Sequence, residues 1–348
     1  MRGCGFKSKL AILGLALGSL GVIIALHLEA LEVSQLEFDL EVPPGETATY
    51  SFVVGNDEDL VDDIRIYLAD WDRDLEGNHR FYEPGTLPRS NTGWITVSPT
   101  HFTLRPGEQR EVRFTITVPP DVEGTYWGMI IVEGRPRPQE GEEGMVMAVP
   151  RFGIKVYETP PGTARRDGRI TYMERLGLNP LTILVEFENT GNAHLWVGGQ
   201  VEIRDARGET IRTLPIGRFP VLPGAKRRVR AVDEGEGPLP PGEYLALAVL
   251  DFGGPYLVAG QIHFEVEELR LRPIGDATAP PQDLDGDGLY EDVNGDGQLT
   301  MEDVALLEAY IGSPEVQENA RAFDFDNDGD ADLDDVRVLK EMVEAQQG

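Results

Sequence analysis

Two stretches near the end of the chain carry oxygen-bearing side chains at alternate residues. The first is made up of Asp292, Asn294, Asp296, Gln298, Thr300 and Asp303. The second is made up of Asp324, Asp326, Asp328, Asp330, Asp332 and Asp335. Alternate residues of a tight loop point inward, and calcium, a hard cation, requires six to eight oxygen ligands. The residue types and their spacing therefore predict two calcium sites.

The spacing is that of EF-hand loops, in which positions 1, 3, 5, 7, 9 and 12 supply the ligands and Gly at position 6 allows the sharp turn. Gly297 and Gly329 occupy position 6, and the backbone carbonyls of Gln298 and Asp330 occupy position 7. Every ligand position is therefore filled in both loops. A solvated acidic linker would need both complete sets to arise by chance, so we favour metal binding.

A third acidic stretch begins before the first loop and overlaps it. Its carboxylates belong to Asp283, Asp285, Asp287 and Glu291. Its twelfth position falls on Asn294, so it cannot close independently of the first loop. Two interpretations stay open, namely a further ion held by these four carboxylates or an extension of an acidic linker.

Helices are expected after each loop and not before the first one. Apolar residues at helical spacing follow the loops, as Val304, Leu307 and Ile311 and again as Val336, Leu339 and Val343. Ser313 and Pro314 are typical of a helix start, which predicts a short connecting helix to about Ala322. Pro280 and Pro281, with the glycines that follow them, exclude an entering helix.

This plan of two Asp-closed loops, each followed by a helix, resembles a dockerin domain. The resemblance implies calcium-dependent docking to a cohesin domain on a scaffold or cell surface, and many dockerins are attached to polysaccharide-degrading enzymes. Dockerins recognise their partner partly through positions 10 and 11 of each loop, often Ser or Thr. Here these positions hold Met301 with Glu302 and Leu333 with Asp334. Exposed Met301 and Leu333 would form an apolar docking patch, and packing within the module is the alternative.

The charge of the chain is concentrated in this region. The formal net charge is −30, and residues 283–348 contain 20 acidic residues against three basic ones. Nucleic acid is excluded as a partner class, because phosphate binding needs clustered Lys and Arg. A tail this acidic must be disordered or loaded with cations.

The segment from about Leu31 to Val266 is typical of β-sandwiches. Apolar residues alternate with polar ones, for example in residues 113–118, and Pro-Gly pairs mark the turns. Residues 104–107 and 221–224 match as an internal repeat, and Asn56 aligns with Asn189. The sequence therefore predicts a mostly β fold of two tandem immunoglobulin-like β-sandwiches, followed by a small α-helical calcium module.

The first copy resembles the extracellular domains of WxL-interacting proteins and, more loosely, the pilus chaperones. The resemblance is carried by residues 43–46, by Asn56 and by the run from Trp94 to Glu108. It implies a role in surface binding or assembly. No basic residues match the carboxylate-binding pair of a pilus chaperone.

The start of the chain is typical of export. Arg2, Lys7 and Lys9 precede an uncharged apolar run, so residues 1–30 are expected to be a cleaved signal peptide or, alternatively, an N-terminal membrane anchor. We expect an extracellular or cell-surface location, with membrane contact only through an uncleaved segment. Cys4 is the only cysteine, which excludes a disulfide within the chain. The expected domains are residues 31–158, 159–268 and 282–348, with a linker at 269–281.

Catalysis finds little support in the sequence. The histidines lie in no nucleophile, triad or metal motif, and neighbouring acids such as Asp70 and Asp72, or Asp74 and Glu76, do not establish the geometry of a glycosidase. We therefore favour a non-catalytic exported adaptor with a protein partner, a cohesin domain being the candidate. One alternative is an accessory component of a polysaccharide-degrading assembly, whose carbohydrate platform would come from Trp71, Trp94, Trp127 and Trp196. The other is a structural surface protein with a calcium-rigidified C-terminus.

Overall fold

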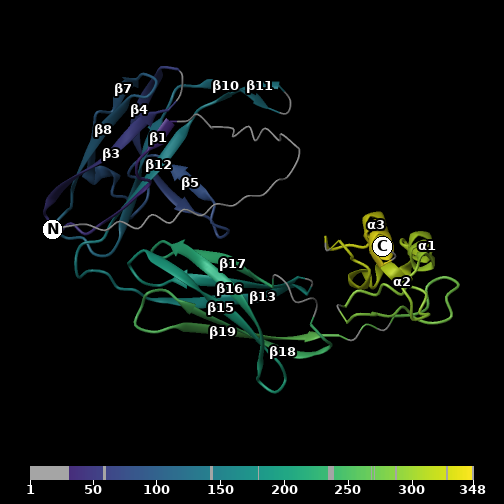
Figure 1. Ribbon diagram of the computed structural model, residues 1–348. Helices are drawn as coiled ribbons and strands as arrows, with labels where there is room; N and C mark the ends of the chain where they lie inside the picture. Colours follow the sequence, from purple (N-terminus) through teal and green to yellow (C-terminus); the bar gives the residue numbers. More distant parts are fainter. Residues whose placement is uncertain are drawn as a thin grey trace, which may run out of the picture.

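The computed structural model describes residues 31–346 except 58–59, 142–143, 179, 234–238, 268, 270, 287 and 327. Two β-sandwiches and a small helical module follow one another along the chain (Figure 1). The expected signal peptide or anchor lies outside the described residues. None of the helices in the described part has the length and apolar character needed to cross a bilayer.

The first sandwich packs two sheets face to face. One sheet has the order β1 (Leu31–Val33), β3 (Thr47–Asn56), β8 (Gln109–Thr117) and β6 (Ile95–Ser98). The other has the order β2 (Glu37–Leu40), β12 (Arg151–Glu158), β9 (Tyr126–Glu133), β4 (Asp62–Arg73) and β5 (His79–Tyr82), and β7 (His101–Leu104) also pairs with β4. A 3-10 turn, η1 (Thr92–Trp94), precedes β6, and the hairpin of β10 (Arg137–Gly141) and β11 (Gly144–Ala148) extends from this body.

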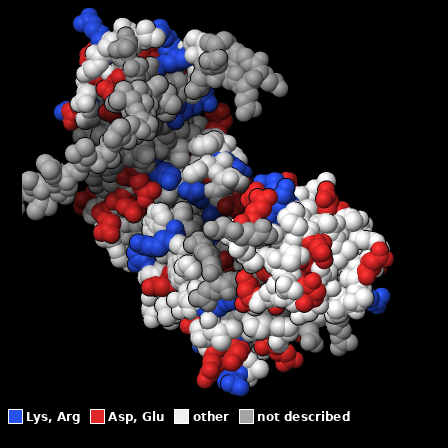
Figure 2. Space-filling view, turned by 45° about the vertical axis from the view of Figure 1, so that its right-hand side comes forward, with Lys and Arg blue, Asp and Glu red and all other residues white. Residues whose placement is uncertain are grey.

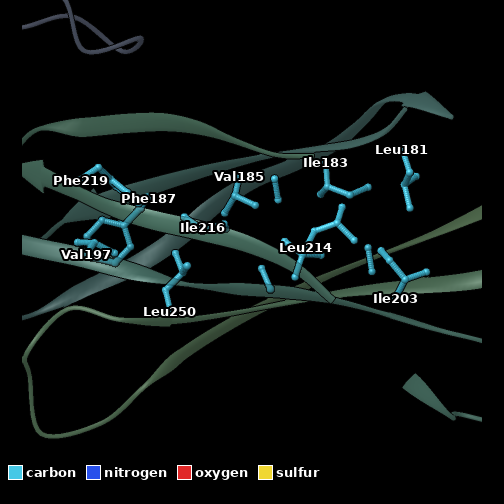
Figure 3. Close-up of a cluster of buried hydrophobic side chains, with 14 of the residues drawn as sticks. Leu181, Ile183, Val185, Phe187, Val197, Ile203, Leu214, Ile216, Phe219 and Leu250 are labelled. Carbon is cyan, nitrogen blue, oxygen red and sulfur yellow. The ribbon is translucent and has the colours of Figure 1, made fainter. Parts of the chain in front are cut away.

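The second sandwich has a sheet of three strands and a sheet of four. The first consists of β13 (Gly168–Leu178), β14 (Leu181–Asn189) and β17 (Lys226–Val232). The second has the order β16 (Thr210–Val221), β15 (Leu195–Arg204), β18 (Gly242–Asp251) and β19 (Val258–Val266). Alternate apolar residues of β14, namely Ile183, Val185 and Phe187, point toward Leu214 and Leu250 between the sheets (Figure 3). The apolar residues at every second position of this strand therefore face inward, between the two sheets.

The internal repeat is visible in the hydrogen bonds of two buried asparagines. Asn56 Nδ2 donates to the Leu60 carbonyl at 2.7 Å and the Leu104 carbonyl at 3.1 Å. Asn189 Nδ2 donates to the Ala193 carbonyl at 2.8 Å and to a Val221 carbonyl at 3.0 Å. Each amide donates to two carbonyls at the end of its strand, which accounts for the shared residue in the two copies.

The seam between the two sandwiches contains a cluster of buried aromatic and apolar residues. Trp71, Trp127 and Tyr157 of the first sandwich are buried together with Leu222 of the second. The Arg228 backbone N–H donates to the Leu75 carbonyl at 2.8 Å across this seam. The aromatic residues thus serve to join the two bodies.

The C-terminal module is formed by α1 (Met301–Tyr310), α2 (Pro314–Gln317), the 3-10 turn η2 (Ala320–Ala322) and α3 (Leu333–Gln346). Leu307 and Leu339 are fully buried where α1 and α3 pack. Ile274, from the segment expected to be a linker, is buried in the same core. The connecting helix α2 is shorter than expected, because the backbone leaves the helical conformation at Asn319. The predicted mostly β fold with two sandwiches and a small helical module is confirmed.

Candidate calcium centre

In the first loop, backbone N–H groups hold the predicted ligands inward. Asp292 accepts from Asp296 N at 3.0 Å and from Gly297 N at 2.6 Å. Asp303 accepts from Asn294 N at 3.0 Å and from Thr300 N at 2.8 Å. The residues at positions 1 and 12 therefore close the loop from opposite ends. Gly297 has a φ of +87°, a conformation that an L side chain rarely adopts.

The second loop repeats this pattern residue for residue. Asp324 accepts from Asp328 N at 3.0 Å and Gly329 N at 3.1 Å. Asp335 accepts from Asp326 N at 3.1 Å and Asp332 N at 2.7 Å. Gly329, at a φ of +105°, takes the place of Gly297. The same local chemistry thus folds both twelve-residue stretches into the same turn.

The carboxylates of the second loop converge closely. Oxygens of Asp324, Asp326 and Asp328 lie within 4.8 Å of one another, and so do oxygens of Asp330, Asp332 and Asp335. Burial raises the pKa of Asp324, and the nearby charges of Asp335 and Asp328 raise it further, against hydrogen bonds that lower it. In the first loop, Asn294, Gln298 and Thr300 stand in place of three of these carboxylates. Its remaining carboxylates, those of Asp292, Asp296 and Asp303, form no group this close.

The third acidic stretch also forms a turn. Asp283 accepts from Gly286 N at 2.7 Å and from Gly288 N at 2.8 Å, and Glu291 accepts from Leu284 N at 3.2 Å. Oxygens of Asp283, Asp285 and Glu291 lie within 4.8 Å of one another. Asp287 lies outside the described residues. The two interpretations of this stretch stay open.

Each loop leads directly into a helix. Thr300 is the N-cap of α1, where its hydroxyl accepts from Glu302 N at 3.2 Å and Asp303 completes a capping box. Asp303 is therefore both the last residue of the loop and the first-turn acid of the helix. Asp335 lies in the first turn of α3 in the same way. Packing of the two helices thereby fixes how the two loops sit side by side.

The first residue of each helix is exposed. Met301 is 45% exposed and Leu333 is 63% exposed. Of the two alternatives left open by the sequence, the structure places these side chains on the surface and not inside the module. They lie at equivalent positions of the repeat and offer apolar area to a partner.

The other candidate residues have structural partners. Asp70 is buried and accepts from Ser90 Oγ at 2.5 Å and Leu87 N at 2.7 Å. Asp72 pairs with Arg80 at 2.7 Å. The proposed carbohydrate platform is not formed as a group, because Trp71 and Trp127 are buried in the seam. These acids and indoles stabilise the fold.

The donor set of the loops fits calcium. Both loops supply carboxylate oxygens at positions 1, 5 and 12 and a backbone carbonyl at position 7, which matches a hard cation. Asn294 and Thr300 add an amide and a hydroxyl oxygen in the first loop. When bound, the ion would neutralise these clustered charges and couple its binding to the folding of the module.

Comparison with known proteins finds similar solved structures at low sequence identity. None of the curated proteins matches this chain. Among solved structures, the class 5 fimbriae chaperone CfaA is 12% identical, with a TM-score of 0.38, and covers 69% of this chain and 100% of its own. A chain of the CFA/I chaperone–tip adhesin complex is 11% identical, with a TM-score of 0.38, over 67% of this chain and 98% of its own. The E. coli chaperone DraB is 16% identical, with a TM-score of 0.34, over 68% of this chain and 96% of its own.

The C-terminal region matches a family model of its own. The match spans residues 290–344, which include both complete loops, α1 and most of α3. Its description is that of the dockerin type I domain, the family to which the two Asp-closed loops pointed. Residues 290–344 of this chain are therefore a dockerin type I domain.

Proposed function

We propose that this protein is an exported, non-catalytic adaptor whose dockerin module binds calcium and docks to a cohesin-type partner. The observation that carries the proposal is the pair of equivalent loops within the matched region, closed by the same hydrogen bonds to Asp292 and Asp324. The two sandwiches would then be the cargo that is held at a scaffold or cell surface. An extracellular site suits the proposal, because millimolar calcium is available there to weak sites.

The calcium ligands would be the twelve residues of the two loops. Asp292, Asp296, Asp303, Asp324, Asp326, Asp328, Asp332 and Asp335 supply carboxylates, Asn294 and Thr300 supply side-chain oxygens, and Gln298 and Asp330 supply backbone carbonyls. The chemistry of the ion is structural, since it offsets the repulsion of carboxylates that the loop holds together. The domain limits that go with this proposal are residues 31–158, 159–268 and 282–348.

Calorimetry of the full chain tests the metal sites. The double variant Asp292→Ala with Asp324→Ala should abolish calcium binding and melt α1 and α3, while the sandwiches stay folded. Glu344→Gln, an exposed change on α3, serves as the matched control and should bind calcium as the wild type does. Unchanged calcium binding by the double variant would refute the assignment of the ligands.

A capture assay with immobilised cohesin domains tests the docking. Binding should require calcium and be lost in chelator. Leu333→Ser and Met301→Ser should weaken capture without changing calcium affinity, because both side chains are exposed and the change adds no charge beside the loops. If the calcium-loaded protein is captured by no cohesin, the module acts as a rigid C-terminal stalk and the adaptor function is wrong.

One observation favours a second function for the sandwiches. Trp196 is 37% exposed and lines a cavity of about 590 Å³ at the junction of the two bodies, together with Asp39, Arg166 and Arg218. An exposed indole beside charged groups suits a sugar ring. A glycan array probed with the wild type and Trp196→Ala would test an accessory role in polysaccharide degradation, and a signal that survives this change would exclude the cavity.

A further inference from the structure

Positively charged side chains gather at the seam between the two sandwiches, away from the calcium module. Arg73 lies at the end of β4 and Lys155 on β12 of the first sandwich, and Arg227 lies on β17 of the second. Figure 2 shows basic side chains where the upper and lower bodies meet. These basic residues stand out in a chain whose net charge is −30, although Asp72, Asp74 and Glu76 lie in the same region.

Two of the three guanidinium nitrogens of Arg227 are buried without a hydrogen-bond acceptor in the described part of the chain. Its side chain is 9% exposed, and among the described residues no acceptor is within reach of its Nε or Nη1. The Nε of Arg73 is likewise buried with no acceptor among the described residues. Burial of a guanidinium is costly unless its donors are satisfied, because the protein does not replace the lost hydration.

The carboxylates near Arg227 do not take up its donors. Asp74 is close enough to act on the charge of Arg227, but its oxygens accept from Gly77 N at 2.7 Å, Asn78 N at 2.8 Å and Asn78 Nδ2 at 2.9 Å. Glu76 also acts on Arg227 only through its charge. Asp74 therefore stabilises its own turn, and the Nε and Nη1 donors of Arg227 are left for another acceptor.

The backbone of Gly77 contacts both guanidinium groups. Its carbonyl accepts from Arg73 Nη1 at 2.6 Å. Its φ is +98°, and a Cβ at this position would lie 1.6 Å from Arg227 Nη1. The Arg227 guanidinium thus packs directly on the Gly77 backbone, so the two like charges are held together by backbone contacts.

The other groups around the seam are a lysine, two histidines and an acid. Lys155 Nζ lies 5.7 Å and the Arg73 guanidinium carbon 5.6 Å from the ring of Trp71. Burial lowers the pKa of His79 and of His194 to about 4, with Arg73 and Lys155 acting in the same direction. Glu37, 3.7 Å from Lys155, is the acid that offsets this lysine.

A cavity gives access to this region from the surface. It has a volume of about 680 Å³, and both sandwiches contribute to its lining, the second through Leu222 and Lys226. The basic Arg73, Arg80, Arg89 and Lys226 and the acidic Asp72, Asp74 and Glu76 line it; Arg73 reaches this cavity, and Arg227 is not part of its lining. The cavity is large enough for an ion or for the acidic group of a sugar.

We propose that the seam binds a small oxyanion between Arg73 and Arg227. The planar donor fork of arginine matches sulfate and carboxylate oxygens, so one such group would accept from donors of both sandwiches. The anion would bridge the two bodies and offset the repulsion between the two guanidinium groups. Two kinds of ligand carry such an oxyanion. One is a free inorganic anion, and the other is an acidic glycan with a sulfate or carboxylate group. The site is independent of the docking function.

Calorimetric titration of the full, calcium-loaded chain with sodium sulfate, at ionic strength matched with chloride, tests the site. The wild type should show one binding event. Arg227→Gln and Arg73→Gln should each weaken the affinity by about tenfold, which is the loss expected for one charge-assisted contact. Arg207→Gln, which changes an exposed arginine of the second sandwich, should bind sulfate as the wild type does.

Absence of sulfate binding by the wild type, or equal affinity in the wild type and both seam variants, would overturn the proposal. If circular dichroism shows that Arg227→Gln does not fold, Arg73→Gln decides the question alone. A sulfated disaccharide then identifies the source. If the disaccharide binds more tightly than sulfate and this binding is lost in the same variants, the ligand is a glycan. If it binds more weakly, the ligand is the free ion. Both results support the site.

Discussion

His194 makes the joint between the sandwiches sensitive to acid. Its imidazole stacks on Tyr157 with ring centroids 4.3 Å apart and planes 5° apart, and its buried Nε2 has no acceptor or donor among the described residues. Burial, with smaller effects from Lys155 and Arg73, lowers the pKa of His194 from 6.5 to about 4. The folded protein therefore keeps this side chain neutral where the unfolded chain is protonated.

The direction and the magnitude of the pH effect on the unfolding free energy follow from the linkage between protonation and folding. A base with a lowered pKa in the folded state contributes stability that is present above its unfolded pKa and is lost as the pH falls toward its folded pKa. With pKa values of 6.5 and about 4, His194 loses about 2 kcal/mol of unfolding free energy between about pH 7.5 and about pH 5. Glu158 acts in the opposite direction, because burial raises its pKa from 4.5 to about 7 and its protonation on acidification favours the folded state.

Comparison of the wild type with a His194 variant separates the effect of His194 on the unfolding free energy from that of Glu158. Urea unfolding would be followed by the fluorescence of the buried Trp71 and Trp127, in saturating calcium, for the wild type and for His194→Phe. Phenylalanine keeps a ring against Tyr157 but cannot take a proton. The drop in unfolding free energy from about pH 7.5 to about pH 5 should be smaller in His194→Phe by about 2 kcal/mol. An equal drop in both proteins would refute the reasoning, whatever the contribution of Glu158.

Three further changes test other parts of the fold. Asn189→Ala removes the donor to the Ala193 and Val221 carbonyls and should lower the unfolding free energy by about 2 kcal/mol in urea titration, since buried acceptors lose their partner. Asp62→Asn removes the buried charge that pairs with Arg137 at 2.5 Å and accepts from Arg135 N at 2.8 Å, so limited proteolysis should cut the β10–β11 hairpin faster. Leu307→Ala should destabilise the calcium module by about 3 kcal/mol and raise the calcium concentration at which its helices form, as followed by circular dichroism.

The sequence predicted those parts of the molecule whose determinants are local. The hydrogen bonds of each calcium loop, such as those from Gly297 N and Thr300 N, join residues within one twelve-residue stretch. Spacing alone therefore indicated the loops. The strands were predicted for the same reason, because alternation in β14 reports directly on which side chains are buried.

Features that depend on distant contacts were not predicted. Arg73 and Arg227 belong to different sandwiches, and no local pattern marks either of them as a buried charge. Ile274, with Leu269 and Leu271 before it, lies in a segment rich in turns, where no clear periodicity indicated that these residues pack against the core of the module. The roles of Trp71 and Trp127 likewise depend on how the two bodies meet, which composition does not determine.

The two calcium loops share one hydrogen-bond pattern but differ in charge. The first has three carboxylates among its predicted ligand positions, and the second has Asp at all six. Like charges at such short separations repel strongly, and repulsion grows with each pair added. If the loops bind calcium as proposed, we expect the turn of the second loop to depend more on the bound cation than that of the first, although both are closed by the same backbone N–H groups. Since α1 and α3 pack on each other through Leu307 and Leu339, we expect the second loop to set the calcium concentration at which the whole module folds.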